Sequence, residues 1–248
     1  MRSILIVCGL VTCASPASAQ WDVTVFLGDA ATSPGRLEIR SAASDTSVAV
    51  EPVRFGDESS ASPWYYGARL TWRPNRVPWL GVEAEFIHAK AIADPAQLVQ
   101  VRGRLDGVLV DGDWRLGTIL PRFELSHGLN FLLGNAVIYW PIASRKADTL
   151  VEIVGRLGLG LTMPHVESSF DGHEEDAYQL GGRAVDAAIG SQIRVWRHVS
   201  AIVEFKMTRT RQRVDVGAAN VEGVFTTRHV VAGIVWRTAP VRHQPFIR

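Results

Sequence analysis

The feature that most constrains the fold of this chain is a two-residue alternation of apolar and polar side chains. Eight stretches carry it, each bounded by turn-forming or polar residues. Successive side chains of a strand point to opposite faces, so each stretch predicts a strand with one apolar and one polar face. The predicted strands are 20–28, 64–73, 79–90, 127–140, 149–163, 182–196, 198–213 and 224–237.

The first residues have the pattern of a cleavable export signal. Met1 and Arg2 precede the apolar run 4–11, and residues 17–19 (Ala-Ser-Ala) form a small-residue cleavage sequence. Residues 1–19 are therefore predicted to be a signal peptide. The alternative is a lipoprotein signal at residues 10–13 (Leu-Val-Thr-Cys), which the threonine before the cysteine fits poorly.

Removing this leader changes the cysteine content and the net charge of the chain. Both cysteines, Cys8 and Cys13, lie in the leader, so the mature part has no disulfide, thiol nucleophile or cysteine metal site. Loss of Arg2 lowers the 26 basic residues to 25, which equals the number of acidic residues. The resulting net charge of zero argues against a generic nucleic-acid binder.

The remainder of the chain contains no run of about 18 apolar residues, so no helix is predicted to span a membrane. An exported chain that stays in a membrane must then close its strands into a barrel, because lipid cannot satisfy an open sheet edge. The connections also alternate in length, which is typical of outer-membrane barrels with long external loops and short periplasmic turns. The short ones are Arg73 to Pro78, Trp140 to Asp148 and Arg197-His198; the long or polar ones are 29–63, 91–126, 164–181 and 214–223.

These patterns predict an all-β fold, an eight-stranded antiparallel up-and-down transmembrane β-barrel (OmpA-like) in the cell outer membrane. Residues 20–237 form the barrel, and residues 238–248 a periplasmic tail. Parity places charges of both signs in the lumen, which favours a filling of paired charges over the alternative of an ion or proton path. The predicted lumenal charges are Arg69, Glu83, Glu85, Glu152, Arg156, Asp186, Arg194, Glu204 and Lys206.

Cations and imidazoles recur on the outward face, just beyond the apolar part of each strand. The outward set is His88, Lys90, His165, Arg209, Arg211 and Arg228. Lipid phosphates of the outer leaflet lie at this level, and basic groups bind them. The alternative is that the strands leave the membrane here and tolerate any polar residue.

Residues 163–176 combine histidines with carboxylates, the ligand types that suit a divalent transition metal. Their spacing matches no closed metal motif, so an acidic solvated loop is the favoured interpretation. His88 and His165 lie two strands apart, and about 10 Å would separate their backbones at ~4.8 Å per strand. They are the candidate metal pair.

Four stretches, 64–72, 86–90, 130–141 and 163–167, together resemble the α-proteobacterial outer-membrane barrels grouped with lipid A oxidases. Residues 88–90 (His-Ala-Lys) and 164–167 (Pro-His-Val-Glu) are the most specific parts. The resemblance implies oxidation of the proximal glucosamine of lipid A to an aminogluconate with molecular oxygen. The chain departs from the family's Gly-His-Asn at residues 126–130 (Ser-His-Gly-Leu-Asn), where the histidine is displaced by two positions.

The sequence therefore predicts a lipid A-modifying enzyme with lipopolysaccharide as its partner; the alternative is a non-catalytic small barrel with a structural or surface-interaction role. A pore is a third hypothesis, which a filled interior opposes. The predicted catalytic residues are His88, Asn130, His165 and Glu167, the substrate-binding residues are Lys90, Arg209, Arg211 and Arg228, and the metal ligands are His88 and His165.

Overall fold

The computed structural model describes residues 19–125, 128–145 and 148–238. Most of the predicted signal peptide, Ser126 and His127, and all but the first residue of the predicted tail lie outside the described residues. Within them the chain is all-β apart from one 3-10 turn, Leu116–Thr118, and its strand pairs are antiparallel, as predicted. No helix of the described part is long and apolar enough to cross a membrane.

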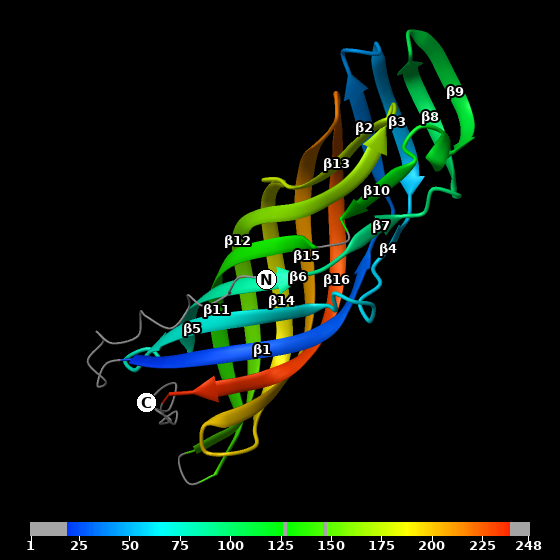
Figure 1. Cartoon of the computed structure of the whole chain (residues 1–248). Helices are drawn as coiled ribbons and strands as arrows, with labels where there is room; N and C mark the ends of the chain where they lie inside the picture. Colours follow the sequence, from blue (N-terminus) through cyan, green and yellow to red (C-terminus); the bar gives the residue numbers. More distant parts are fainter. Residues whose placement is uncertain (1–18, 126–127, 146–147, 239–248) are drawn as a thin grey trace, which may run out of the picture.

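Eight long strands pair in a closed cycle (Figure 1). Each pairs with the strand before and after it in the series below, and β16 pairs back onto β1, with Val25 opposite Ile234. Each predicted strand overlaps one of the eight. The series is β1 (Ala19–Thr32), β5 (Tyr66–Pro74), β6 (Leu80–His88), β11 (Leu129–Arg145), β12 (Asp148–Phe170), β14 (Gly182–Arg194), β15 (Val199–Val216) and β16 (Ala219–Arg237).

The outer face of this ring carries an apolar belt. Val25 on β1, Leu157 on β12 and Val230 on β16 are 57%, 69% and 57% exposed, although each alternates with buried neighbours. The alternation therefore places the larger apolar side chains outside, the arrangement expected of a sheet that faces lipid. Five exposed tryptophans lie near the end of the ring with the short turns, as an interfacial girdle would: Trp72, Trp79, Trp140, Trp196 and Trp236.

The long connections differ from the prediction, because most of their length is strand rather than loop. β12 continues to Phe170, and β15 and β16 meet in a tight hairpin at Gly217, so 214–223 is not a loop. In Figure 1, β2, β3, β8 and β9 extend the sheet beyond the ring. The added strands are β2 (Gly35–Ser41), β3 (Thr46–Val53), β4 (Phe55–Gly56), β7 (Ala91–Ala93), β8 (Leu98–Leu105), β9 (Val108–Arg115), β10 (Arg122–Leu125) and β13 (His173–Tyr178).

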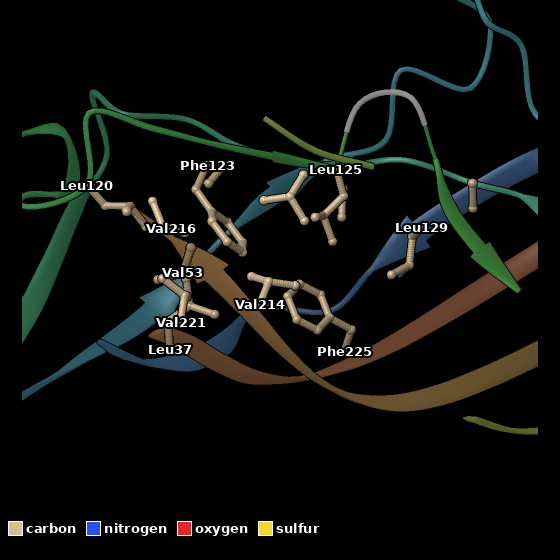
Figure 2. Close-up of a cluster of buried hydrophobic side chains, with 14 of the residues drawn as sticks. Leu37, Val53, Leu120, Phe123, Leu125, Leu129, Val214, Val216, Val221 and Phe225 are labelled. Carbon is tan, nitrogen blue, oxygen red and sulfur yellow. The ribbon is translucent and has the colours of Figure 1, made fainter. Parts of the chain in front are cut away.

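An apolar core explains why the strands continue past the ring. Phe123, Val214 and Phe225 are almost fully buried, and they pack with residues of β2 and β3 in the cluster that Figure 2 shows. The same cluster includes Phe26 and Phe131 of the ring strands. The core therefore continues from the ring into the extension, and it gives β2, β3 and the extended parts of β15 and β16 one buried apolar face, which stabilises them beyond the ring.

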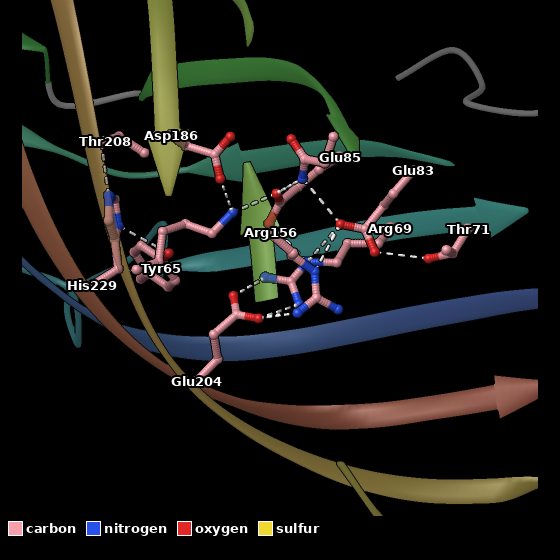
Figure 3. Close-up of polar contacts among 12 residues, drawn as sticks. Tyr65, Arg69, Thr71, Glu83, Glu85, Arg156, Asp186, Glu204, Thr208 and His229 are labelled. Atoms are coloured by element: carbon pink, nitrogen blue, oxygen red, sulfur yellow. Dashed lines mark hydrogen bonds and ion pairs between the residues drawn. The ribbon is translucent and has the colours of Figure 1, made fainter. Parts of the chain in front are cut away.

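Charged side chains fill the middle of the ring, as predicted (Figure 3). Arg69 donates hydrogen bonds to Glu85 (2.8 Å) and Glu204 (2.5 Å), and Arg156 donates to Glu204 and to Glu83 (3.0 Å). A second buried group lies nearer the short turns, where Glu152 accepts from Arg73 and Arg237, both at 2.7 Å. Of the nine charges predicted to be lumenal, Arg194 is half-buried, and the other eight are 0–5% exposed: Arg69, Glu83, Glu85, Glu152, Arg156, Asp186, Glu204 and Lys206.

The network requires a glycine on β12. A Cβ at Gly158 would overlap the side-chain oxygens of Asp186 and Asn135, whereas a Cβ at Gly155 would meet nothing within 4 Å. Asp186 also accepts a hydrogen bond from Lys206 at 2.9 Å, so it has little freedom to move away. Gly158 is therefore a packing requirement of the lumen.

We expect Gly158→Ala to lower the free energy of unfolding by about 1–3 kcal/mol, the range for overpacking. Gly155→Ala, three residues away on the same strand, is the matched control and should leave stability near wild type. Urea unfolding in detergent micelles, followed by tryptophan fluorescence, measures both. Equal effects of the two substitutions would contradict the assignment of Gly158 to the lumen.

Candidate functional site on the outer wall

Strand register brings an imidazole and an amide together on the outer wall. Tyr66 of β5 pairs with His88 of β6, and Asn130 of β11 pairs with Met163 of β12. Ile87, next to His88, pairs with Phe131, next to Asn130, so the imidazole and the amide are neighbours across β6 and β11. The four side chains therefore form one row across four strands.

This row forms part of the lining of a groove of about 440 Å³. The ring of Tyr66 stacks on the ring of His88, with centroids 5.0 Å apart and planes 18° apart. Tyr178 is 61% exposed, whereas His88 is 4% exposed, so the imidazole lies deep between aromatic walls. The groove is lined by Pro63, Tyr66, Phe86, His88, Asn130, Leu132, Met163 and Tyr178.

Hydrogen bonds fix the orientation of the imidazole. The Nδ2 of Asn130 donates to the backbone oxygen of Met163 at 3.1 Å, which leaves Oδ1 as the acceptor that faces His88 Nδ1 at 2.9 Å. The Nδ1 of His88 is therefore the donor, and in the neutral ring Nε2 carries the lone pair. Gly128 lies against this pair, with a φ of 115°, and a Cβ there would be 2.5 Å from His88 Nδ1.

His165 and Glu167 lie beside this groove rather than in its lining. The His165 ring meets the Tyr178 ring edge-on at 4.5 Å, and its Nε2 is 3.3 Å from a carboxylate oxygen of Asp176. Glu167 accepts a hydrogen bond from Arg122. The sequence analysis missed Tyr178 and Arg122, because it treated 164–181 and 91–126 as loops and therefore had no register for β13 and β10 against β12.

The predicted metal site receives no support from these positions. Among the described residues, no three histidine, cysteine, aspartate or glutamate side chains are arranged to hold a metal ion. His88 instead engages an amide and a phenol ring, and His165 engages Tyr178 and Asp176. We therefore derive no step through a metal at His88 and His165.

Lys90 differs from its expected position at an exposed rim. It is 4% exposed, and its ammonium donates to the backbone oxygens of Ala61 (3.0 Å) and Glu58 (3.4 Å). Its charge therefore holds the connection before β5 against the ring. β6 ends at His88, so the residues after it no longer follow the alternation of the strand and turn under this connection. Parity alone therefore does not predict the position of Lys90.

Lys90→Met should release the segment around Glu58 and Ala61, because two backbone oxygens lose their donor. We expect amide hydrogen exchange near Ala61 to accelerate about tenfold, the effect of losing roughly 1.4 kcal/mol of local stability. Exchange in β15 should be unchanged. Lys90→Arg is the control, since it keeps a donor at the same place. Unaltered exchange near Ala61 in Lys90→Met would show that the contacts carry no stability.

The predicted substrate-binding arginines are exposed on the outer wall. Arg209 and Arg211 alternate with buried neighbours on β15, and Arg228 does so on β16. Arg211 forms an ion pair with Glu222 at 2.5 Å. Arg183 of β14, which the sequence reasoning did not single out, is exposed at the same margin. These arginines lie on β14–β16 and are not in the lining of the groove.

No family model matches the chain, and no curated protein matches it. Solved structures that are similar in shape include Neisserial surface protein A, with 10% identity, a TM-score of 0.40, and coverage of 88% of this chain and 96% of the other. The outer membrane protein OprG from Pseudomonas aeruginosa has 12% identity and a TM-score of 0.40, with coverage of 90% of this chain and 95% of the other. The outer membrane protein AlkL, solved in lipid bilayers, has 8% identity and a TM-score of 0.42, with coverage of 99% of this chain and 100% of the other.

Proposed function

We propose that this chain is an eight-stranded transmembrane β-barrel of the cell outer membrane that modifies lipid A on its outer wall. The apolar belt and the charged interior support the membrane part of the proposal. In a hydrocarbon phase every backbone polar group needs an internal partner, and a closed ring of paired strands supplies one. β1 begins and β16 ends on the side of the short turns, which is the periplasmic side in such barrels.

The filled lumen is the reason to look for a lipid substrate on the outer wall. Arg69, Arg156 and Lys206 occupy the middle of the ring with their carboxylate partners, and an apolar core follows toward the loop end. A saccharolipid does not fit into such an interior. It meets the protein from the side, where the groove of His88 lies at the loop end of the apolar belt.

The single observation that carries the enzymatic proposal is the oriented His88–Asn130 pair deep in an aromatic groove. With Nδ1 held by an amide, Nε2 is the ring atom that would act as a general base for a sugar hydroxyl. Tyr66 and Tyr178 offer aromatic faces, which pack well against the apolar face of a sugar ring. His88 is thus the proposed base, and Asn130 the residue that positions it.

The specific reaction comes from the resemblance to lipid A oxidases. Oxidation of the hemiacetal of the proximal glucosamine removes two electrons and two protons, which reduce molecular oxygen to hydrogen peroxide. Water then opens the lactone to the aminogluconate. His88 would accept the proton of the anomeric hydroxyl. Lys90 and Glu167 are bound to a loop and to Arg122, so their roles in this proposal are structural.

Mass spectrometry of lipid A tests the proposal. The chain is expressed in a Gram-negative host whose lipid A lacks this modification and carries a free anomeric hydroxyl on the proximal glucosamine, because a phosphate at that position would leave no hemiacetal to oxidise. Lipid A is extracted from cells with and without the chain. We expect a species that has gained one oxygen atom and is absent from the control. Purified barrel with lipid A and oxygen should release hydrogen peroxide in equal amount. Unchanged lipid A in both experiments would overturn the enzymatic proposal.

A non-catalytic barrel is the second candidate, and one observation favours it. Several polar residues that the sequence suggested for catalysis or binding are engaged in structural contacts, namely Lys90 with a loop, Glu167 with Arg122 and His165 with Tyr178. In that case deletion should weaken the outer-membrane barrier, measured as detergent sensitivity, while the lipid A spectrum stays unchanged.

A further inference from the structure

Two adjoining hollows lie in the outer wall over β11, β12, β14 and β15, apart from the groove of His88. Their volumes are about 500 and 660 Å³. They share the apolar, outward-facing residues Ala136, Leu157, Ala187 and Met207, so the two together form one hollow. Among the outward-facing residues of the lining, Arg209 is the charged one, and it lies at the loop end.

Arg209 belongs to a row of arginines at the margin of the apolar belt. On β14, β15 and β16 the first charged outward residue beyond the belt is Arg183, Arg209 and Arg228, respectively. Register keeps them close, since Arg209 pairs with Val185, two residues from Arg183, while Arg228 pairs with Met207, two residues from Arg209.

The charges of these three arginines are not neutralised by the protein around them. Within the described part of the chain, none has a carboxylate at ion-pair distance, whereas the neighbouring Arg211 has Glu222 at 2.5 Å. Three uncompensated guanidinium groups beside an apolar hollow are complementary to an anionic headgroup with an attached hydrocarbon chain. Guanidinium suits phosphate in particular, because it can donate two parallel hydrogen bonds.

We propose that this hollow seats one acyl chain of a phosphorylated saccharolipid of the outer leaflet, with its phosphate bound by Arg209 and flanked by Arg183 and Arg228. From Arg209 to Phe205, the far end of the lining on β15, the strand rises about 14 Å. That length is on the scale of one leaflet of a ~30 Å hydrocarbon core. The inference rests on the outer-membrane location of the proposed function, but it does not require catalysis at His88.

The hollow can be filled by substitution without disturbing the barrel. A Cβ at Gly155 meets nothing within 4 Å, and Gly155 borders the hollow between Ile138 and Ile189. Gly155→Leu therefore places a side chain where the acyl chain would lie. Ala232→Leu is the matched control, because Ala232 is exposed on β16, outside the lining.

The test measures retention of hexa-acylated lipid A by the purified full-length barrel in detergent, using native mass spectrometry. Wild type and Ala232→Leu should retain one lipid. Gly155→Leu and Arg209→Gln should each weaken retention about tenfold, as expected for the loss of a charge-assisted contact or of the chain seat. Heat-modifiable gel mobility confirms that each variant is folded.

Three outcomes would overturn the inference. They are unchanged retention in Gly155→Leu, equal retention of dephosphorylated lipid A, and equally tight retention of phosphatidylglycerol. The last would assign the hollow to a glycerophospholipid. Failure of the proposed function is separate and visible, because it leaves lipid A unmodified in cells while the purified barrel still retains it. Conversely, modified lipid A in cells together with no retention of lipid A by the purified barrel would support the proposed function and contradict this inference.

Discussion

Arg69→Met is expected to destabilise the folded barrel by about 3–5 kcal/mol, the cost of leaving buried carboxylates without their partner. Arg69 is 2% exposed and donates to both Glu85 and Glu204. Methionine fills similar space but cannot donate a hydrogen bond. Arg156 and Lys206 remain beside these carboxylates, and they limit the loss to this range rather than a larger one. Urea unfolding in phospholipid vesicles measures the change.

Arg211→Met is the matched control for this measurement. The same type of ion pair joins Arg211 to Glu222 at 2.5 Å, but the arginine side chain is 75% exposed. Solvent screens such a pair, so its loss should change stability by less than about 1 kcal/mol. Similar effects of Arg69→Met and Arg211→Met would mean that water reaches the lumen and that the interior is not the sealed charge network described above.

His88→Gln is expected to lower lipid A modification by at least about 100-fold, the smaller end of the contribution of a general base. Glutamine can keep a hydrogen bond to Asn130, so the barrel should fold and reach the membrane in normal amount. The readout is the fraction of modified lipid A in cells, normalised to folded protein on a heat-modifiability gel. His173→Gln is the control, since His173 is exposed on β13 and does not line the groove.

Asn130→Leu separates positioning from chemistry in the same groove. Loss of the amide removes the acceptor of His88 Nδ1, so the preference for the tautomer with a lone pair on Nε2 is lost. We expect a smaller reduction than in His88→Gln, together with a shift in the pH profile of peroxide release by purified barrel. Wild-type activity in His88→Gln would remove His88 from the mechanism and favour the non-catalytic barrel.

The lumenal charges show why part of this structure is readable from sequence. Glu83 and Glu85 alternate with Val82 and Ala84, and this alternation fixes the face of each residue whatever the strand pairs with. Arg73 and Arg237 escaped the prediction because they lie at strand ends, where the alternating pattern is too short to assign a face. Their role became visible once both reached Glu152.

The contacts within the site could not be predicted from the sequence alone. His88 and Asn130 were both predicted to be catalytic, but the 2.9 Å contact that orients the imidazole depends on the register between β6 and β11. The stack of Tyr66 on His88 depends in the same way on the register of β5 and β6. Lys90 was placed by parity on the outer face, yet the loop that covers it belongs to a distant segment, residues 58–61.

The sequence by itself determined the strands of the ring, the face of each residue along them and the charged filling, because these follow from alternation within single segments. Tertiary structure decided which residues meet across strands, that the long connections continue as sheet over an apolar core, and that three arginines gather beside an apolar hollow. Those features depend on strand register and on contacts between segments far apart in the chain, and no local pattern encodes either.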